Sequence, residues 1–226
     1  KAGWGVDCEL SLTAGGEHDV VWILAPKQHE PLAQAGMKVS IIMPTYRRSH
    51  TLYRTVRSIQ RQSYSNWELI IIDNEGTAGY RFDDPRISVR AHAEWTSASY
   101  ARNQGLSYAT GDLVCFFDDD DDMFPEYLEK FVNVFATNPQ VKMVRCGMIV
   151  SAGQTNFSYA TPECCLRREF ATPTWASHTS SHDQLYFRNI IATCGWSESN
   201  GDIINLPEPL CRANCDPHGG LRSGRL

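Results

Sequence analysis

Residues 114–125 read VCFFDDDDDMFP, an apolar run that ends in five consecutive aspartates. Neighbouring like charges repel one another, so a run of this kind is most often a solvated loop. Residues 113–117, however, are typical of a short and fully buried strand. The aspartates therefore follow the carboxyl end of a predicted strand, where open α/β sheets bind their ligands. Because Mg²⁺ and Mn²⁺ prefer clustered oxygen ligands, the pattern predicts a divalent-metal site.

On both sides of this stretch, predicted strands alternate with predicted helices. Apolar runs predict strands at residues 39–43, 67–72, 87–90, 113–117 and 141–150. Helices are expected after a cap at Ser49, over residues 97–109, from Pro125, and near His182. This alternation predicts an α/β fold of three layers with a mostly parallel central sheet. Residues 151–181 are rich in Ser, Thr, Ala and Pro, so we expect long loops there.

Composition and charge exclude several classes of function. The net charge of −5 and the lack of a basic stripe argue against nucleic acid as a partner. The longest apolar runs are too short to cross a bilayer, and the N-terminus lacks the pattern of a signal peptide. The sequence therefore predicts a soluble, cytoplasmic protein without a transmembrane segment, although it could be part of a longer chain.

The eight cysteines are expected to be reduced thiols rather than a disulfide framework. Cys115 and Cys146 lie within predicted strands, where a free thiol behaves as a small apolar side chain. Cys211, Cys215 and His218 allow a weak zinc cluster, but their spacing lacks two paired knuckles.

The acidic run allows more than one kind of site. Asp118, Asp120 and Asp122 have the spacing of a calcium loop, but Met123 stands where that loop needs glycine. A phosphotransferase of the Asp-x-Asp type usually places its nucleophile on the first strand, whereas this run follows the fourth. Two alternatives stay open beside a metal clamp on a nucleotide diphosphate. One is a phosphohydrolase or nucleotidyltransferase, and the other is a non-catalytic module that binds carbohydrate or nucleotide sugar.

Four segments together favour one reading. They are VSIIMPTYR (39–47), ELIIID (68–73), ARNQGLSYATGD (101–112) and FDDDDDMFP (117–125). In order and spacing, residues 38–150 resemble the family-2 glycosyltransferases. The resemblance implies a GT-A fold, which is a Rossmann-like nucleotide-diphospho-sugar transferase fold. It also implies a metal-dependent enzyme that moves one sugar, with inversion, from a nucleotide-diphospho donor such as a UDP-sugar to a hydroxyl of a sugar, lipid-linked or other acceptor.

The resemblance also implies roles on the donor side. Asp73 would accept a hydrogen bond from the base, and Arg102 would lie near the diphosphate. Asp120 would bind Mn²⁺ or Mg²⁺ directly, and Asp118 would hold the ribose, a metal-bound water or both. The nucleotide pocket as a whole would include Pro44, Thr45, Tyr46, Arg47, Asp73, Arg102, Asp118, Asp119, Asp120 and Arg212.

On the acceptor side, inverting transfer needs a general base. The segment SHDQL at residues 181–185 is the nearest match to the acidic pair that the family places there, which implies Asp183 as the base. His182 replaces the usual Glu and is an alternative base, as are Glu163 and Glu169. Arg212 or His218 would return to the diphosphate, and His218 is a third candidate metal ligand.

These roles suggest a division of the chain. Residues 1–37 are expected to form an arm or added strands, with an apolar run at residues 20–24. Residues 38–150 would form the nucleotide-sugar-binding α/β part. Residues 151–226 would supply the acceptor side and a flexible tail of the same domain.

Overall fold

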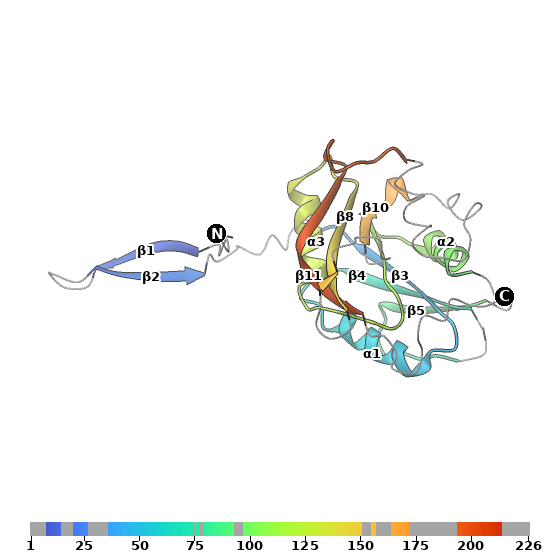
Figure 1. Ribbon diagram of the computed structural model, residues 1–226. Coiled ribbons are helices and arrows are strands. Elements are labelled where there is room, and N and C mark those ends of the chain that lie inside the picture. The colour runs from blue at the N-terminus through green and yellow to red at the C-terminus, as the bar shows by residue number, and fades with distance from the viewer. Residues whose placement is uncertain are drawn as a thin grey trace. The chain divides into compact units, whose positions relative to one another are not determined.

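Side chains or backbone are described for a large part of the chain in a computed structural model, shown in Figure 1. The described residues are 8–14, 20–26, 36–74, 76, 79–92, 97–150, 155–156, 164–171 and 194–213. The chain divides into two compact units, Lys1–Gln34 and Ala35–Leu226. The first contains the antiparallel hairpin of β1 (Cys8–Ala14) and β2 (Val20–Pro26), in which Cys8 pairs with Pro26 and Ala14 with Val20.

The second unit is an α/β fold built on a mixed sheet with the strand order β5-β4-β3-β6-β10-β8-β11-β7. The pairs β5–β4, β4–β3 and β3–β6 are parallel, as is β8–β11, while β10 and β7 pair in the antiparallel sense and β9 pairs with β8. The strands are β3 (Val39–Thr45), β4 (Trp67–Asp73), β5 (Ile87–Ala91), β6 (Leu113–Phe116), β7 (Asp121–Met123), β8 (Met143–Ile149), β9 (Thr155–Asn156), β10 (Cys164–Arg167) and β11 (Ile203–Ala213).

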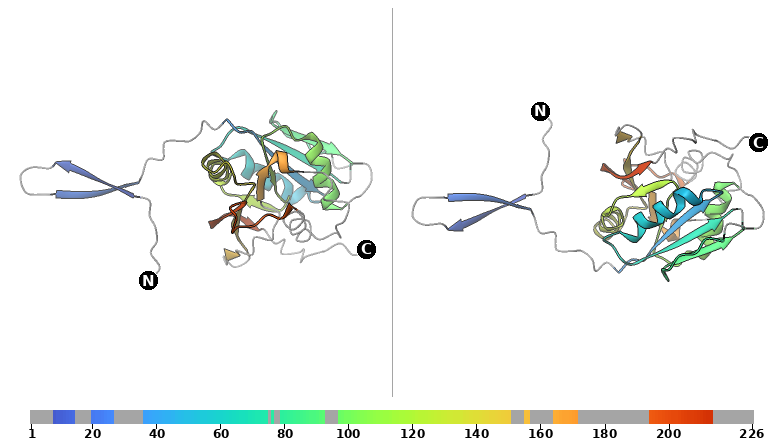
Figure 2. Two further views of the ribbon diagram at one scale, coloured as in Figure 1. Left: turned by 90° about the horizontal axis from the view of Figure 1, so that it is seen from above. Right: turned by 90° about the horizontal axis from the view of Figure 1, so that it is seen from below.

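Helices cover both faces of this sheet, as predicted. Alternate residues of β3 face opposite ways, so Ile41 and Met43 pack in one apolar cluster and Ile42 in another. The first cluster takes in side chains of α1 (Ser49–Gln60) and α3 (Tyr127–Thr137), and the second takes in those of α2 (Ala98–Tyr108). The two views of Figure 2, taken from above and from below, show these helices on either side of the sheet. Burial of β3 on both faces explains its unbroken apolar sequence.

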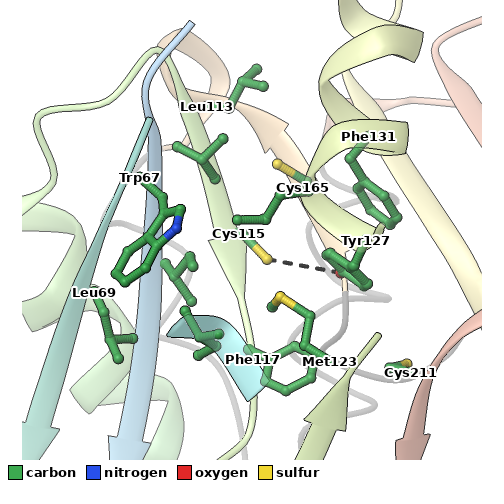
Figure 3. Packing of buried hydrophobic residues seen from close by; sticks show 14 of the residues in the cluster. Trp67, Leu69, Leu113, Cys115, Phe117, Met123, Tyr127, Phe131, Cys165 and Cys211 are labelled. Carbon is green, nitrogen blue, oxygen red and sulfur yellow. Dashed lines mark hydrogen bonds between the residues drawn. The ribbon is translucent and has the colours of Figure 1, made fainter. Parts of the chain in front are cut away.

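The larger cluster is rich in sulfur and aromatic side chains (Figure 3). Tyr127 stacks on Phe131 at 4.2 Å between ring centroids, and Cys115 Sγ lies 3.8 Å from the Tyr127 hydroxyl oxygen. Cys146 Sγ lies 4.0 Å from Cys211 Sγ. The predictions of reduced, buried Cys115 and Cys146 are confirmed. Cys211 is also buried in this core, whereas Cys215 and His218, the other residues of the weak zinc cluster, lie outside the described residues.

The helix boundaries differ in part from those predicted. Ser97 caps α2 through its side chain, which accepts a hydrogen bond from the Tyr100 amide. The cap predicted at Ser49 is wrong: Arg48 takes the cap position, and Ser49 is the first helical residue. Helix α3 begins at Tyr127, two residues after Pro125, because Glu126 forms its cap.

Besides the two-residue β9, three longer strands of the second unit lie where none was predicted, namely β7, β10 and β11. The loop expected at residues 151–181 is wrong at β10, which inserts between β6 and β8 and joins the two halves of the sheet. The aspartate run itself contributes β7, which pairs with the end of β11. Each of these strands is stabilised by partners that are distant in the sequence, which local periodicity does not reveal. The helix predicted near His182 lies outside the described residues.

At the amino ends of the central strands, one carboxylate joins three chain segments. Glu68 accepts hydrogen bonds from Lys38 Nζ at 2.7 Å, Ser40 Oγ at 2.6 Å and the Thr110 amide at 2.8 Å. Burial would raise the pKa of Glu68, but these hydrogen bonds lower it to about 2. The ionised carboxylate therefore stabilises the start of β3, β4 and the loop before β6.

Replacing this carboxylate should make the folded state less stable in a pH-dependent way. Because the pKa of Glu68 is lowered in the folded state, its contribution is present above pH 4.5 and is lost as the pH falls toward 2. Glu68→Gln should reduce the free energy of unfolding by about 1–3 kcal/mol at pH 7. In denaturant titrations, the gap between variant and wild type should close between pH 5 and about pH 2. A gap that stays constant over this range would contradict the assignment.

Candidate metal and nucleotide site

The functional side chains meet at the carboxyl ends of β3, β4 and β6. Thr45, the last residue of β3, pairs with Asp73, the last residue of β4. The Phe117 amide donates to the Ile42 carbonyl, which extends the contact between β6 and β3 one residue beyond the strand. The aspartate run therefore lies beside Thr45. Its predicted position after the carboxyl end of a strand is confirmed.

The five aspartates do not share one environment. Carboxylate oxygens of Asp118, Asp120 and Asp121 lie within 4.8 Å of one another, which is close enough for the three to hold one metal ion. Asp121 is buried in β7, opposite Ala213 of β11. Its membership in this carboxylate group was missed from the sequence, because five identical residues give no sign of which side chains converge. Three carboxylates supply hard oxygen donors of the kind that Mg²⁺ and Mn²⁺ bind.

Asp119 is not a member of this group and supports the loop instead. Its Oδ2 accepts a 2.6 Å hydrogen bond from the Thr45 hydroxyl, and its Oδ1 lies 3.2 Å from Arg48 Nη1. Its backbone carbonyl accepts from the Thr55 hydroxyl on α1. Burial raises the pKa of Asp119 to about 6, although Arg48 and Thr45 act to lower it. Asp119 thus ties the run to β3 and α1.

Arg102 holds the other side of the run. Its side chain is only 1% exposed, and its Nη2 donates to Asp118 Oδ1 at 2.7 Å. Helix α2 lies close enough to β3 for this contact because it carries Gly105 there. A Cβ at Gly105 would lie 2.3 Å from Ile42 Cγ2. The guanidinium therefore fixes the orientation of one of the three clustered carboxylates.

The predicted nucleotide residues at the carboxyl ends of β3 and β4 differ in their exposure. Tyr46 is 38% exposed, and the Arg47 guanidinium lies 5.1 Å from the centre of its ring. Arg47 has a φ of 56°, a left-handed conformation that is uncommon for residues other than glycine. Asp73 is buried on the adjacent strand, and its carbonyl accepts from the His92 amide. An aromatic face and a buried carboxylate are suited to stacking on a base and pairing with it.

Two further candidates lie apart from the clustered carboxylates. In the β11–β7 ladder Arg212 stands opposite Asp122, so the two side chains lie on the same face of the sheet. The Arg212 guanidinium lies over the Phe124 ring. Glu169 is exposed in a 3₁₀ turn (Arg168–Phe170) that begins where the Arg168 amide bonds the Asp112 carbonyl. Asp112 precedes β6, whereas the aspartates follow it. This placement removes Glu169 as a base beside the metal site.

The remaining candidates are not in the described part of the chain. Asp183, His182 and Glu163, considered for the base, lie outside the described residues. His218, considered as a metal ligand, also lies outside them.

Comparison with known proteins is consistent with this arrangement. The model of glycosyl transferase family 2 matches residues 40–195, and the chain therefore belongs to that family. A putative colanic acid biosynthesis glycosyl transferase, WcaA of Escherichia coli K12, is 36% identical over 164 residues, which are 68% of this chain and 54% of the relative. The UDP-Glc:alpha-D-GlcNAc-diphosphoundecaprenol beta-1,3-glucosyltransferase WfgD of Escherichia coli is 35% identical over 105 residues, which are 44% of this chain and 42% of the relative. The chain spans about half the length of these relatives.

Solved structures share the fold. Residues 1–349 of Staphylococcus aureus TarS in complex with UDP-GlcNAc match with a TM-score of 0.68 at 18% identity, covering 84% of this chain and 62% of that one. The mannosyltransferase PcManGT of Pyrobaculum calidifontis, solved with GDP-Man and Mn²⁺, matches with a TM-score of 0.64 at 19% identity, covering 84% and 60%. The predicted GT-A fold is confirmed. Within the described residues, no helix combines the length and the apolar character needed to cross a membrane.

The contact between Arg102 and Asp118 generates a test of how the site is built. In a double-mutant cycle, Arg102→Met and Asp118→Asn should show a coupling of about 1–3 kcal/mol in the free energy of unfolding, because each change leaves the other partner without its ion pair. Urea titrations of the single and double variants measure this coupling. Effects that add to within about 0.5 kcal/mol would show that the ion pair does not hold Asp118.

Proposed function

We propose that this chain is a metal-dependent, inverting glycosyltransferase that moves one sugar from a UDP-sugar to an acceptor hydroxyl. The observation that carries the proposal is the convergence of Asp118, Asp120 and Asp121 beside the end of β3. The relatives support the choice of donor, since one is named for UDP-Glc and a structural neighbour was solved with UDP-GlcNAc. They also support the metal, because another neighbour was solved with Mn²⁺.

On the donor side, the chain's own residues bind and orient. Asp118, Asp120 and Asp121 would hold the metal, with Arg102 keeping Asp118 in place. A bound Mn²⁺ or Mg²⁺ would supply positive charge for the diphosphate as it leaves. The exposed ring of Tyr46 would stack on the base, and the buried carboxylate of Asp73 would accept its N–H. Arg212 remains a candidate for contact with the diphosphate if its side chain turns from Phe124.

On the acceptor side, the general base remains a proposal from sequence. Inversion requires the acceptor oxygen to approach the sugar from the face opposite the diphosphate, while a base takes its proton. Asp183 is the residue we propose for that role, on its resemblance to the family's acidic segment. In this proposal the acceptor offers a hydroxyl group and is a sugar, a lipid-linked compound or another hydroxyl compound.

The metal site can be tested by two changes that remove the same charge from the same run. Asp120→Asn should abolish Mn²⁺-dependent UDP binding, because it removes a clustered carboxylate. Asp122→Asn should leave that affinity within about threefold of wild type, since Asp122 pairs with Arg54 on α1 instead. Isothermal titration with UDP, with and without Mn²⁺, measures both. Equal losses in the two variants would mean that the run acts only through its total charge.

The proposed base is tested separately from donor binding. Asp183→Asn should lower the single-turnover transfer rate by about 10²–10⁴-fold, the usual contribution of a general base. The affinity for UDP and Mn²⁺ should stay near that of wild type, because the base contacts the acceptor. Rapid-quench transfer assays and UDP titrations give the two quantities. Transfer within a few-fold of wild type would exclude Asp183 and turn attention to His182.

A further inference from the structure

Arg48 places a positive charge among the aspartates of the site. Its Nη1 lies 3.2 Å from Asp119 Oδ1 and also donates to Asp120 Oδ2. Asp120 is one of the three clustered carboxylates, whereas Asp119 is the buried support. The same guanidinium nitrogen therefore bridges a fixed carboxylate and a carboxylate proposed to bind the metal.

The backbone of Arg48 is fixed, but its side chain has room to turn. The Arg48 carbonyl accepts hydrogen bonds from the Thr51 and Leu52 amides at 3.1 and 3.0 Å, which begin α1. The side chain is 45% exposed. An arginine guanidinium is always protonated in proteins, so Arg48 brings a full positive charge to Asp119 and Asp120. A movement of Arg48 would thus be a rotation of its side chain about an anchored helix end.

A metal ion bound to Asp120 would be repelled by the positive charge of the Arg48 guanidinium in its present position. A divalent cation bound to Asp120 would lie within a few ångströms of Arg48 Nη1, because both use the same carboxylate. Two like charges so close to each other repel even near a protein surface, where water screens them in part. Binding of the metal therefore favours a turn of Arg48 away from Asp120.

We propose that Arg48 serves as the counter-ion of Asp120 in the absence of metal. When metal and diphosphate bind together, its guanidinium is displaced from Asp120. This inference rests on the proposed function and extends it to the order of binding. The diphosphate offers the displaced guanidinium a new anion, and it offers the metal additional oxygen ligands. Arg48 is a positioning residue in this account, and it makes the metal and the nucleotide strengthen each other's binding.

A coupling of this kind is reciprocal. If Arg48 weakens the binding of metal alone and is satisfied by the diphosphate, UDP must raise the affinity for Mn²⁺ by the same factor as Mn²⁺ raises the affinity for UDP. Removal of Arg48 should then raise the affinity for Mn²⁺ alone and reduce this factor. A residue with only a structural role would lower the affinity for Mn²⁺ or leave it unchanged when removed.

Arg54 provides a matched control on the same helix. Its Nε lies 3.3 Å from Asp122 Oδ1, and its Nη2 donates to the Asp120 backbone carbonyl at 3.0 Å. Among the described residues, the ion pair of Arg54 is with Asp122 and not with Asp118, Asp120 or Asp121. Arg54→Ala therefore removes the same charge from nearby without uncovering a carboxylate proposed to bind metal.

The test measures free Mn²⁺ by electron paramagnetic resonance in titrations without nucleotide and with saturating UDP. Arg48→Ala should bind Mn²⁺ alone about tenfold more tightly than wild type, and the strengthening by UDP should shrink about tenfold. Arg54→Ala should change both quantities by less than about threefold. Arg48→Gln, which keeps hydrogen-bonding groups but not the charge, should behave as Arg48→Ala and decides the matter if the alanine variant does not fold.

The outcomes separate this inference from the function on which it rests. If wild type binds Mn²⁺ with UDP but the Arg48 variants bind Mn²⁺ alone no more tightly than Arg54→Ala, the counter-ion role is overturned and the metal-dependent function stands. If neither wild type nor any Arg48 variant binds Mn²⁺ with UDP, both are overturned. Binding of Mn²⁺ alone by the Arg48 variants and not by wild type would support the displacement.

Discussion

The repulsion among five adjacent carboxylates is the constraint on which the site depends. At the end of β6 it is relieved by giving the side chains different directions and different partners. Asp119 is buried against Thr45 and Arg48, Asp118 receives Arg102, and Asp122 receives Arg54. The pairing of β7 with β11 fixes the alternation that separates Asp121 from Asp122. Carboxylate oxygens of Asp118, Asp120 and Asp121 nevertheless converge, and their combined negative charge suits a divalent cation.

The fold around this point was predictable where the sequence carries local signals. Strands β3 and β4 are buried on both faces, and their unbroken apolar runs identify them directly. The small residues of α2 gave its position, and Gly105 shows why they are small, since the helix approaches Ile42 closely. Strands β7, β10 and β11 were not predicted, because each depends on a partner from a distant part of the chain. The antiparallel insertion of β10 between β6 and β8 is an example.

The sequence predicted where the site lies, but not which role each aspartate of the run has. The position of the aspartates after a buried strand, and the resemblance carried by four segments, indicated a metal and nucleotide site. Identical neighbours gave no means to assign Asp121 to the carboxylate group or Asp119 to a supporting role, since these depend on β7 and on Thr45. The contact of Arg48 with Asp119 and Asp120 was likewise invisible, because it arises from the geometry of the β3–α1 turn.

The most direct test of this account is anomalous diffraction from crystals of the protein grown with Mn²⁺ and UDP. The account predicts a manganese peak within bonding distance of carboxylate oxygens of Asp118, Asp120 and Asp121, with Asp119 still bonded to Thr45 and the Arg48 guanidinium turned from Asp120. A manganese ion bound to Asp119 or Asp122 instead would contradict the account. Nucleotide bound at the carboxyl ends of β3 and β4 without any metal peak would also contradict it.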